Sequence, residues 1–329
     1  MSKENEVKVS KSIKYLIIIS IFLVTIVLNQ FVPDAANRPD QPKLIFNMFL
    51  GMFILALLSV FIYGHLLGRL KKNGVRTIMD LSVVFGIFFF LWLVLIGKMG
   101  YTDHLRFPSP NSVFTVYQTD FSLLVVRSTS STIIRLMQGY APAIALAIPI
   151  GLFVGRHVNV HDRVAYPIAK MIAPIPPVIF VPYAIELLPS IDMAVIFVIF
   201  IGAFWPIYVN TVYGVRNFDY RYIEAAKTLG ASEKKLYTKI LFPGAFPSIS
   251  AGLFIGLVLA FIVLAVAEGI GGSYGFPGLG WYVLYFADLF DYEKIVAAIL
   301  LIGLVVVVWT AIFDRVQNRI LRWQVKGDE

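Results

Sequence analysis

Two carboxylates inside otherwise apolar runs are the residues of this 329-residue chain that most need a chemical explanation. Glu186 and Glu268 each lie near the end of a long hydrophobic segment. An ionised group in hydrocarbon is costly, so it usually faces a cavity or a partner. Both residues are therefore candidates for lining a polar pathway. Two alternatives are open: Glu268 as a hydrogen-bond acceptor at a helix end, and Glu186 as an interfacial carboxylate reaching water beside Pro189.

Prolines and polar residues supply further pathway candidates. Pro176 and Pro177 free backbone carbonyls within an apolar run, and irregular backbone at membrane depth is tolerated where it lines a cavity or packs in protein. Trp205 and Asn210 lie in the next run, where packing or lipid contact is the alternative role. Two carboxylates on one path would repel anions within roughly 8–10 Å. A solute that used such a path therefore need not be an anion, and a zwitterion or a vitamin-precursor heterocycle stays open.

Catalytic and metal-binding patterns are missing from the sequence. There is no cysteine and no G-x-x-x-x-G-K-[ST] phosphate loop. His157 and His161 are four residues apart, but they lack the glutamate of H-E-x-x-H and lie among basic residues, which favours a solvated surface. We therefore predict a chain that is not an enzyme, holds no metal and binds no ATP or Mg²⁺ itself. The net charge of +8 could suggest nucleic-acid binding, but the basic residues lie between the apolar runs, where they set membrane topology.

The elements that must position these residues are membrane-spanning helices. The chain is 58% hydrophobic and only 15% charged, and the excess is gathered in long runs. About 20 apolar residues cross a bilayer as a helix, so the fold class is an all-α polytopic membrane protein of about eight helices. The predicted spans are 13–32, 44–67, 78–97, 133–154, 168–188, 193–213, 247–270 and 295–313. A short interfacial helix is expected near 113–124.

Lys and Arg set the orientation. They are concentrated in the amino-terminal tail, in alternate loops and in the carboxyl-terminal tail, which places both termini in the cytoplasm. The break after the sixth span is the most basic, with Arg216, Arg221, Lys227, Lys234, Lys235 and Lys239. Two G-x-x-x-G pairs, Gly151 with Gly155 and Gly252 with Gly256, predict close helix packing.

The cytoplasmic break, 216–246, predicts a pair of short helices. Asp219 is a suitable N-cap, and Gly230 tolerates the left-handed dihedrals that end a helix. Ser232 can cap a second helix with Leu236, Tyr237, Ile240 and Leu241 on its apolar side. Pro243 should stop that helix, and Pro247 suits the first turn of the seventh span. The small residues Ala225 and Ala226 are expected on an exposed ridge that suits insertion into a cleft of a partner protein. An amphipathic hairpin lying on the membrane surface is the plainer alternative.

Several motifs in order resemble the permease family of ABC importers for nitrate, taurine and alkanesulfonates, over roughly Phe107 to Trp323. They are Glu224-Ala225-Ala226 with Gly230, Ile240 and Pro243; Arg106 to Pro110; Pro174 to Pro177; Gly202 to Pro206 with Asn210; Ala267-Glu268; Gly278-Leu279-Gly280; and Arg319 to Trp323. Four features depart from the family pattern. The first two spans have no counterpart in its six-helix type I core, Phe242 replaces a leucine, Ala173 replaces an arginine, and Glu186 stands where the family is usually apolar.

The resemblance implies a transport subunit in the inner membrane of a prokaryote. Its partners would be a second permease copy, two ABC ATPase subunits that hold ATP and Mg²⁺, an external substrate-binding protein or lipoprotein, and membrane lipid. It implies domains at 1–77, the extra helices, and 78–329, the permease core. The ATPase-coupling residues would be Asp219, Tyr222, Glu224, Ala225, Ala226, Leu229, Gly230, Ile240 and Pro243. An ion-gradient-driven secondary transporter or channel is the alternative function.

Overall fold

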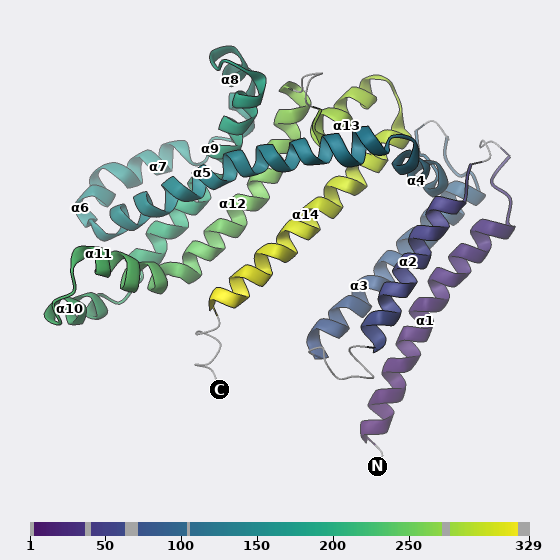
Figure 1. Cartoon of the computed structure of the whole chain (residues 1–329), viewed down its shortest axis with the longest axis horizontal. Coiled ribbons are helices and arrows are strands. Elements are labelled where there is room, and N and C mark those ends of the chain that lie inside the picture. Colours follow the sequence, from purple (N-terminus) through teal and green to yellow (C-terminus); the bar gives the residue numbers. More distant parts are fainter. Residues whose placement is uncertain (1–2, 37–40, 63–71, 104–105, 272–276, 322–329) are drawn as a thin grey trace. The chain divides into compact units, whose positions relative to one another are not determined.

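A computed structural model describes residues 3–36, 41–62, 72–103, 106–271 and 277–321 (Figure 1). Every regular element in these ranges is helical, which confirms the all-α fold class. Residues 63–67 of the second predicted span and residues 322–323 of the carboxyl-terminal motif lie outside them. The elements are α1 (Lys3–Phe31), α2 (Leu44–Phe61), α3 (Lys72–Leu91), η2 (Trp92–Lys98), α4 (Pro110–Thr119), η3 (Phe121–Ser128), α5 (Thr129–Arg156), α6 (Val158–Val160), η4 (His161–Ala165), α7 (Tyr166–Ile172), η5 (Pro177–Phe180), α8 (Val181–Leu187), α9 (Ile191–Arg216), α10 (Tyr220–Thr228), α11 (Glu233–Lys235), η6 (Leu236–Leu241), α12 (Phe242–Gly271), α13 (Leu279–Asp288) and α14 (Tyr292–Ile320).

Six helical segments of the described ranges are long and apolar enough to cross a membrane, and a bent pair makes up to seven. The six are Lys14–Phe31, Ile78–Lys98, Phe121–Arg156, Ile191–Arg216, Glu233–Gly271 and Tyr292–Ile320. The predicted total of eight is not confirmed. In α2 the apolar stretch, Leu44–Val60, is shorter than a span within these ranges.

The predicted fifth span, 168–188, is not one straight helix. Val158–Ile172 and Pro177–Leu187 meet at an angle of 80°. Pro174, Pro176 and Pro177 supply no backbone N–H, and a residue that precedes proline is driven out of the helical region. Pro176 accordingly has extended dihedrals, φ −60° and ψ 121°. The break therefore follows directly from the proline spacing.

The fourth predicted span begins earlier than expected. The short helix α4 ends at Thr119, and η3 then continues into α5 from Phe121, not from residue 133. At the start of α4, Ser109 Oγ accepts a hydrogen bond from the N–H of Ser112, and Pro110 occupies the first turn. These two residues place the helix start three residues before the expected one.

The chain forms two compact units, Met1–Phe121 with Phe286–Ala297, and Ser122–Tyr285 with Ala298–Glu329. This division does not coincide with the predicted border at residue 77, and the predicted domain limits stay a prediction. In the first unit, buried Asn29 and Asn111 donate to one another's side-chain oxygens, each over 2.9 Å. Asn29 also donates to Asn47 over 2.8 Å. These bonds join α1, α2 and α4.

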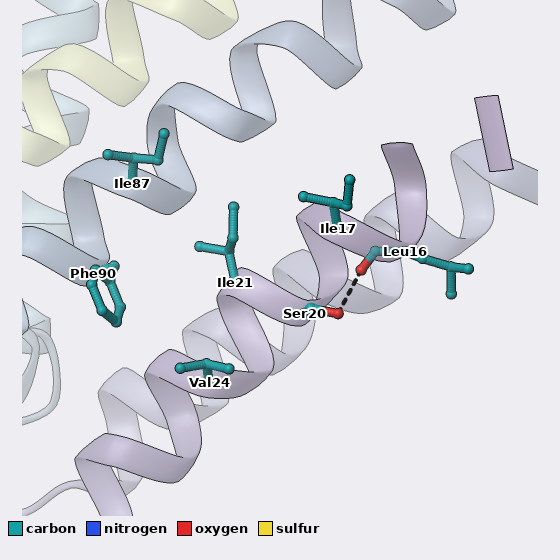
Figure 2. Close-up of a pocket in the computed structure, with 7 residues that line it drawn as sticks. All are labelled: Leu16, Ile17, Ser20, Ile21, Val24, Ile87 and Phe90. Carbon is teal, nitrogen blue, oxygen red and sulfur yellow. Dashed lines mark hydrogen bonds between the residues drawn. The ribbon is translucent and has the colours of Figure 1, made fainter. Parts of the chain in front are cut away.

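A groove lies between α1 and α3 in the first unit (Figure 2). It has a volume of about 470 Å³ and is lined by Leu16, Ile17, Ser20, Ile21, Val24, Ile87 and Phe90. The hydroxyl of Ser20 donates to the Leu16 carbonyl of its own helix over 2.7 Å, as the dashed line in Figure 2 marks. The groove therefore offers a hydrocarbon surface.

In the second unit, α5, α9 and α12 pack side by side, and we call them the bundle (Figure 1). The four predicted small residues lie in their contacts. A Cβ on Gly151 would come within 2.7 Å of Thr211, and one on Gly155 within 2.8 Å of Val215. Gly252 and Gly256 of α12 likewise face Asn210 and Ile207 of α9. The G-x-x-x-G pairs thus let α5 and α12 approach α9 closely, as predicted.

Candidate functional site

A short helical hairpin, residues 219–241, joins α9 to α12 at one end of the bundle (Figure 1). Asp219 caps α10 by accepting from the N–H of Arg221 over 3.0 Å. Gly230 has φ +76°, the left-handed conformation that ends this helix. The N-cap and the glycine corner are therefore confirmed. Ser232 precedes α11, but its side chain makes no capping bond, so that part of the prediction is wrong.

The second half of the hairpin does not stop at Pro243. The turns α11 and η6 continue into α12, so that one helical segment runs from Glu233 to Gly271. Pro243 and Pro247 both lie inside it, and neither ends or begins a helix as predicted. The physical reason lies in η6, a π-helical turn that directly precedes Phe242. A π turn pairs residues five apart instead of four, which shifts the hydrogen-bond register by one residue. The helix can therefore continue past Pro243, which has no N–H to donate.

A core cluster anchors the hairpin to the bundle. Leu236 and Leu241 are fully buried, and Tyr237 and Ile240 pack against the same cluster, so the predicted apolar side is confirmed. The other buried members are Leu152, Val215, Ile223, Ala245 and Ile249, which come from α5, α9, α10 and α12. The hairpin is thus joined to all three bundle helices by apolar burial.

The exposed side of α10 differs slightly from the predicted one. Tyr222 is 63% exposed and Leu229 87% exposed, and Glu224 and Ala225 are exposed between them. Ala226 is half-buried against the core cluster, so it is not on the exposed ridge where it was expected. Ile223 had not been selected and carries the buried side of the helix. We call Tyr222, Glu224, Ala225 and Leu229 the exposed face.

A buried ionic cluster lies at the other end of the bundle, and we call it the Arg135 network. Arg135 Nη1 lies 2.9 Å from Glu268 Oε1, and Arg135 Nη2 lies 2.6 Å from Asp192 Oδ1. Thr132 Oγ1 donates to Glu268 Oε2 over 2.8 Å and accepts from the N–H of Leu279 over 2.8 Å. The cluster therefore joins the ends of α5, α9 and α12 to the start of α13.

Glu268 also acts on the first turn of α13. Its Oε2 accepts the N–H of Gly280 over 3.1 Å, and a carboxylate is favoured at a helix N-terminus by unpaired donors and the helix dipole. A Cβ on Gly278 would collide with the Glu268 carboxyl, and one on Gly280 with the Ala265 carbonyl. The Gly278-Leu279-Gly280 turn thus fits the surface of α12 only because two of its residues lack side chains.

The comparisons with known proteins bear on both ends of the bundle. Residues 147–325 match the family model described as "Binding-protein-dependent transport system inner membrane component". This chain belongs to that family. The match covers the hairpin and Glu268 but begins after Arg135 and after the predicted start at Phe107. The permease core is therefore a multi-pass inner-membrane component of a transport system and not an enzyme.

Named relatives agree with this assignment. The permease is 32% identical over 200 residues to a putative ABC transporter permease protein of Methanocaldococcus jannaschii, covering 61% of this chain and 74% of the relative. It is 32% identical over 238 residues to the bicarbonate transport system permease protein CmpB of Synechocystis, covering 68% and 83%. The nitrate import permease protein NrtB of Synechocystis is 28% identical over 254 residues, covering 72% and 89%. The predicted family is confirmed.

The predicted pathway residues of the permease differ in exposure and in their contacts. Glu186 is exposed on α8, whereas Glu268 is fully buried. Pro177 packs near Gly202 of α9, and the Asn210 amide donates to the Pro206 carbonyl of its own helix over 2.8 Å. Trp205 is half-buried, with its ring edge-on to Phe204 and Tyr208. Their part in a pathway stays a prediction.

Glu268 is not an isolated negative charge. The predicted repulsion of anions by two carboxylates requires both to be unpaired, whereas Glu268 forms an ion pair with Arg135. Arg135, Thr132 and Asp192 had not been selected from the sequence. Arginine inside an apolar segment is itself a signal that a partner exists. The hydrogen-bonded acceptor at a helix end, the alternative left open for Glu268, describes its observed contacts.

Proposed function

We propose that this permease forms the translocation pathway of an ATP-driven importer and receives force through the hairpin. The observation that carries the proposal is the division of the hairpin into two sides. Its exposed face presents small and apolar residues with Glu224, and its other side is buried against α5, α9 and α12. A partner that moves the exposed face must therefore move the bundle. That partner is a separate ATPase subunit, which binds ATP and Mg²⁺ while this chain binds neither.

The assembly we propose has two permease copies, two ATPase subunits and an external substrate-binding protein, with both permease termini in the cytoplasm. We place the hairpin in the cytoplasm because Lys and Arg are concentrated in it. Closure of the ATPase pair on ATP favours one state of the permease, and loading by the binding protein favours the return. Each ligand shifts the equilibrium by its difference in affinity for the two states.

For the cargo we propose a small polar solute of the nitrate, bicarbonate, sulfonate or taurine type, with a vitamin precursor as the remaining class. The names of the relatives favour anions. Pairing with Arg135 offsets the charge of Glu268 only in part, because Asp192 shares the same cation, so the choice of an anion rests on the relatives. Thermal stabilisation of the cognate binding protein by a panel of these solutes tests the class directly.

Association with the ATPase tests the coupling role. Glu224→Lys and Leu229→Asp should lose co-purification of the ATPase and ATP-dependent uptake in proteoliposomes. Glu186→Lys is the matched control, because it reverses another exposed glutamate in the same unit away from the hairpin. It should retain ATPase association. If the wild-type permease transports its cargo without any ATPase subunit, the proposal is wrong and a gradient-driven carrier takes its place.

A further inference from the structure

The hairpin meets α5 through one ionic contact that the proposed function does not use. Arg156 is the last residue of α5 and is 13% exposed at its side chain. Its Nη2 donates to Glu233 Oε1 over 2.9 Å, and its Nη1 pairs with Glu233 Oε2. The guanidinium carbon also lies 4.9 Å from the centre of the Tyr237 ring. We call Arg156, Glu233 and Tyr237 the Arg156 clamp.

The clamp is two-pronged and directional. Two parallel hydrogen bonds between a guanidinium and a carboxylate fix relative orientation as well as distance, which a lysine cannot do. The Tyr237 ring lies under the cation, and Tyr237 also packs against the core cluster that holds Leu152. Apolar contact alone would let the hairpin slide against α5, and the clamp adds a fixed orientation to that contact.

Among the bundle helices, α5 depends most on such a constraint. The hairpin follows α9 directly along the chain and continues into α12 through η6. By contrast, Arg156 and Glu233 are 77 residues apart in sequence. Any motion of the hairpin reaches α9 and α12 through the backbone. It reaches α5 without a backbone link, through the core cluster, the clamp and the packing of α5 on α9 and α12. The other end of α5 carries Thr132 and Arg135, so this helix connects the hairpin to the Arg135 network.

We infer that Arg156 is a positioning residue that transmits hairpin motion to α5, and that losing its pair with Glu233 uncouples ATP hydrolysis from transport without unfolding the protein. The inference rests on the proposed function of the hairpin. The small effect on stability follows from exposure: the Glu233 side chain is 67% exposed, and exposed ion pairs contribute little to folding. The geometry of this pair nevertheless fixes which position of the hairpin is compatible with which position of α5.

The experiment uses the full permease reconstituted with its ATPase and binding protein in proteoliposomes. Transport and ATP hydrolysis are measured on the same vesicles for wild type, Arg156→Gln, Glu233→Gln and the exchanged pair Arg156→Glu with Glu233→Arg. We expect each single variant to keep ATPase association and basal hydrolysis and to transport roughly fivefold less solute per ATP, the low end of measured coupling between sites. The exchanged pair should recover most of the wild-type ratio.

Lys234→Gln is the control, because Lys234 is an exposed cation beside Glu233. It should behave as wild type. Single variants that assemble and transport with the wild-type ratio would overturn the role of the clamp while leaving the hairpin proposal intact. Failure of the wild-type permease to associate with the ATPase would instead overturn the proposed function. If Arg156→Gln does not assemble, Glu233→Gln and the exchanged pair decide, since failure of the exchange to restore coupling rejects the inference.

Discussion

Arg135 Nη1 and Glu268 Oε1 lie 2.9 Å apart although their residues are 133 positions apart in the sequence. Their side chains are 6% and 0% exposed. The pair joins the first turns of α5 to the last turn of α12, and Asp192 extends it to the start of α9. Since the hairpin lies at the opposite ends of the same helices, the two sites are separated along α9 by about 36 Å at 1.5 Å per residue.

Removing the cation of this network should destabilise the permease strongly. In Arg135→Met, Glu268 is left buried without its ionic partner, and breaking a buried pair from one side costs about 3–5 kcal/mol. Glu268→Gln should cost less, because the amide oxygen still accepts hydrogen bonds and Arg135 retains Asp192. Thermal unfolding of the detergent-purified protein measures both. Glu186→Gln, at an exposed carboxylate, should unfold at the same temperature as the wild type. An Arg135→Met variant as stable as the wild type would contradict the stabilising role of the network.

Close packing of α5 on α9 predicts opposite effects for the same substitution at two helical glycines. Gly151→Ala places a Cβ 2.7 Å from Thr211, and overpacking of this kind destabilises by about 1–3 kcal/mol. Gly303→Ala in α14 meets nothing within 4 Å. It should stabilise by about 0.5–1 kcal/mol, since alanine loses less backbone entropy than glycine in a helix. Equal midpoints in a thermal melt of the two variants would show that the packing argument is wrong.

The N-cap of the hairpin should respond to pH only under acidic conditions. Hydrogen bonds from the Arg221 side chain and backbone hold the pKa of the Asp219 carboxyl below its ordinary value of 3.8. A depressed folded-state pKa means that the stabilising contribution is complete above the unfolded-state pKa and is lost as the pH falls through the folded-state pKa. Hydrogen exchange of the α10 amides, corrected for intrinsic rates, should therefore be constant between about pH 6 and 8 and accelerate only in acid.

Asp219→Asn is the control for this effect. The amide oxygen retains capping ability but does not titrate. Its exchange should show no additional acceleration over the acidic range where the wild type loses protection. Identical pH profiles in the two proteins would remove Asp219 as the titrating group.

The features predicted correctly from the sequence depend on short stretches of chain. Asp219 and Gly230 act within a turn of their own positions, so residue type alone predicts the start and end of α10. The G-x-x-x-G pairs also succeeded, because a helix needs small residues wherever another helix approaches closely. The family followed from several such local motifs in order.

The features missed or mispredicted depend on contacts between distant segments. Pro243 was expected to end a helix, but the π turn before it lets the helix continue. Ala226 was placed on the exposed ridge because a single helix does not reveal which side a core cluster will cover. Arg135 carries its own signal as a cation in an apolar run, yet Glu268 and Asp192 become its partners only when three helices pack together.

A final prediction concerns Lys98, which holds the end of α1 in the first unit. Its Nζ donates to the carbonyls of Asn29 and Val32, over 3.2 and 2.7 Å, and pairs with Asp34 over 2.7 Å. Both charged side chains are 7% exposed. In Lys98→Met the Asp34 carboxylate stays buried without its cation, and two carbonyls at a helix end lose a donor. We expect a loss of about 3–5 kcal/mol, the range for one-sided removal of a buried pair.

Limited proteolysis and thermal unfolding measure this loss, and cleavage should appear first between α1 and α2. Lys14→Met is the matched control, because Lys14 is exposed on the same α1 and its replacement should change stability by less than about 0.5 kcal/mol. If Lys98→Met resists protease as well as Lys14→Met does, Lys98 does not fix α1. Helices α1 and α2 would then be held by the hydrogen bonds of Asn29 with Asn47 and Asn111 and by apolar packing.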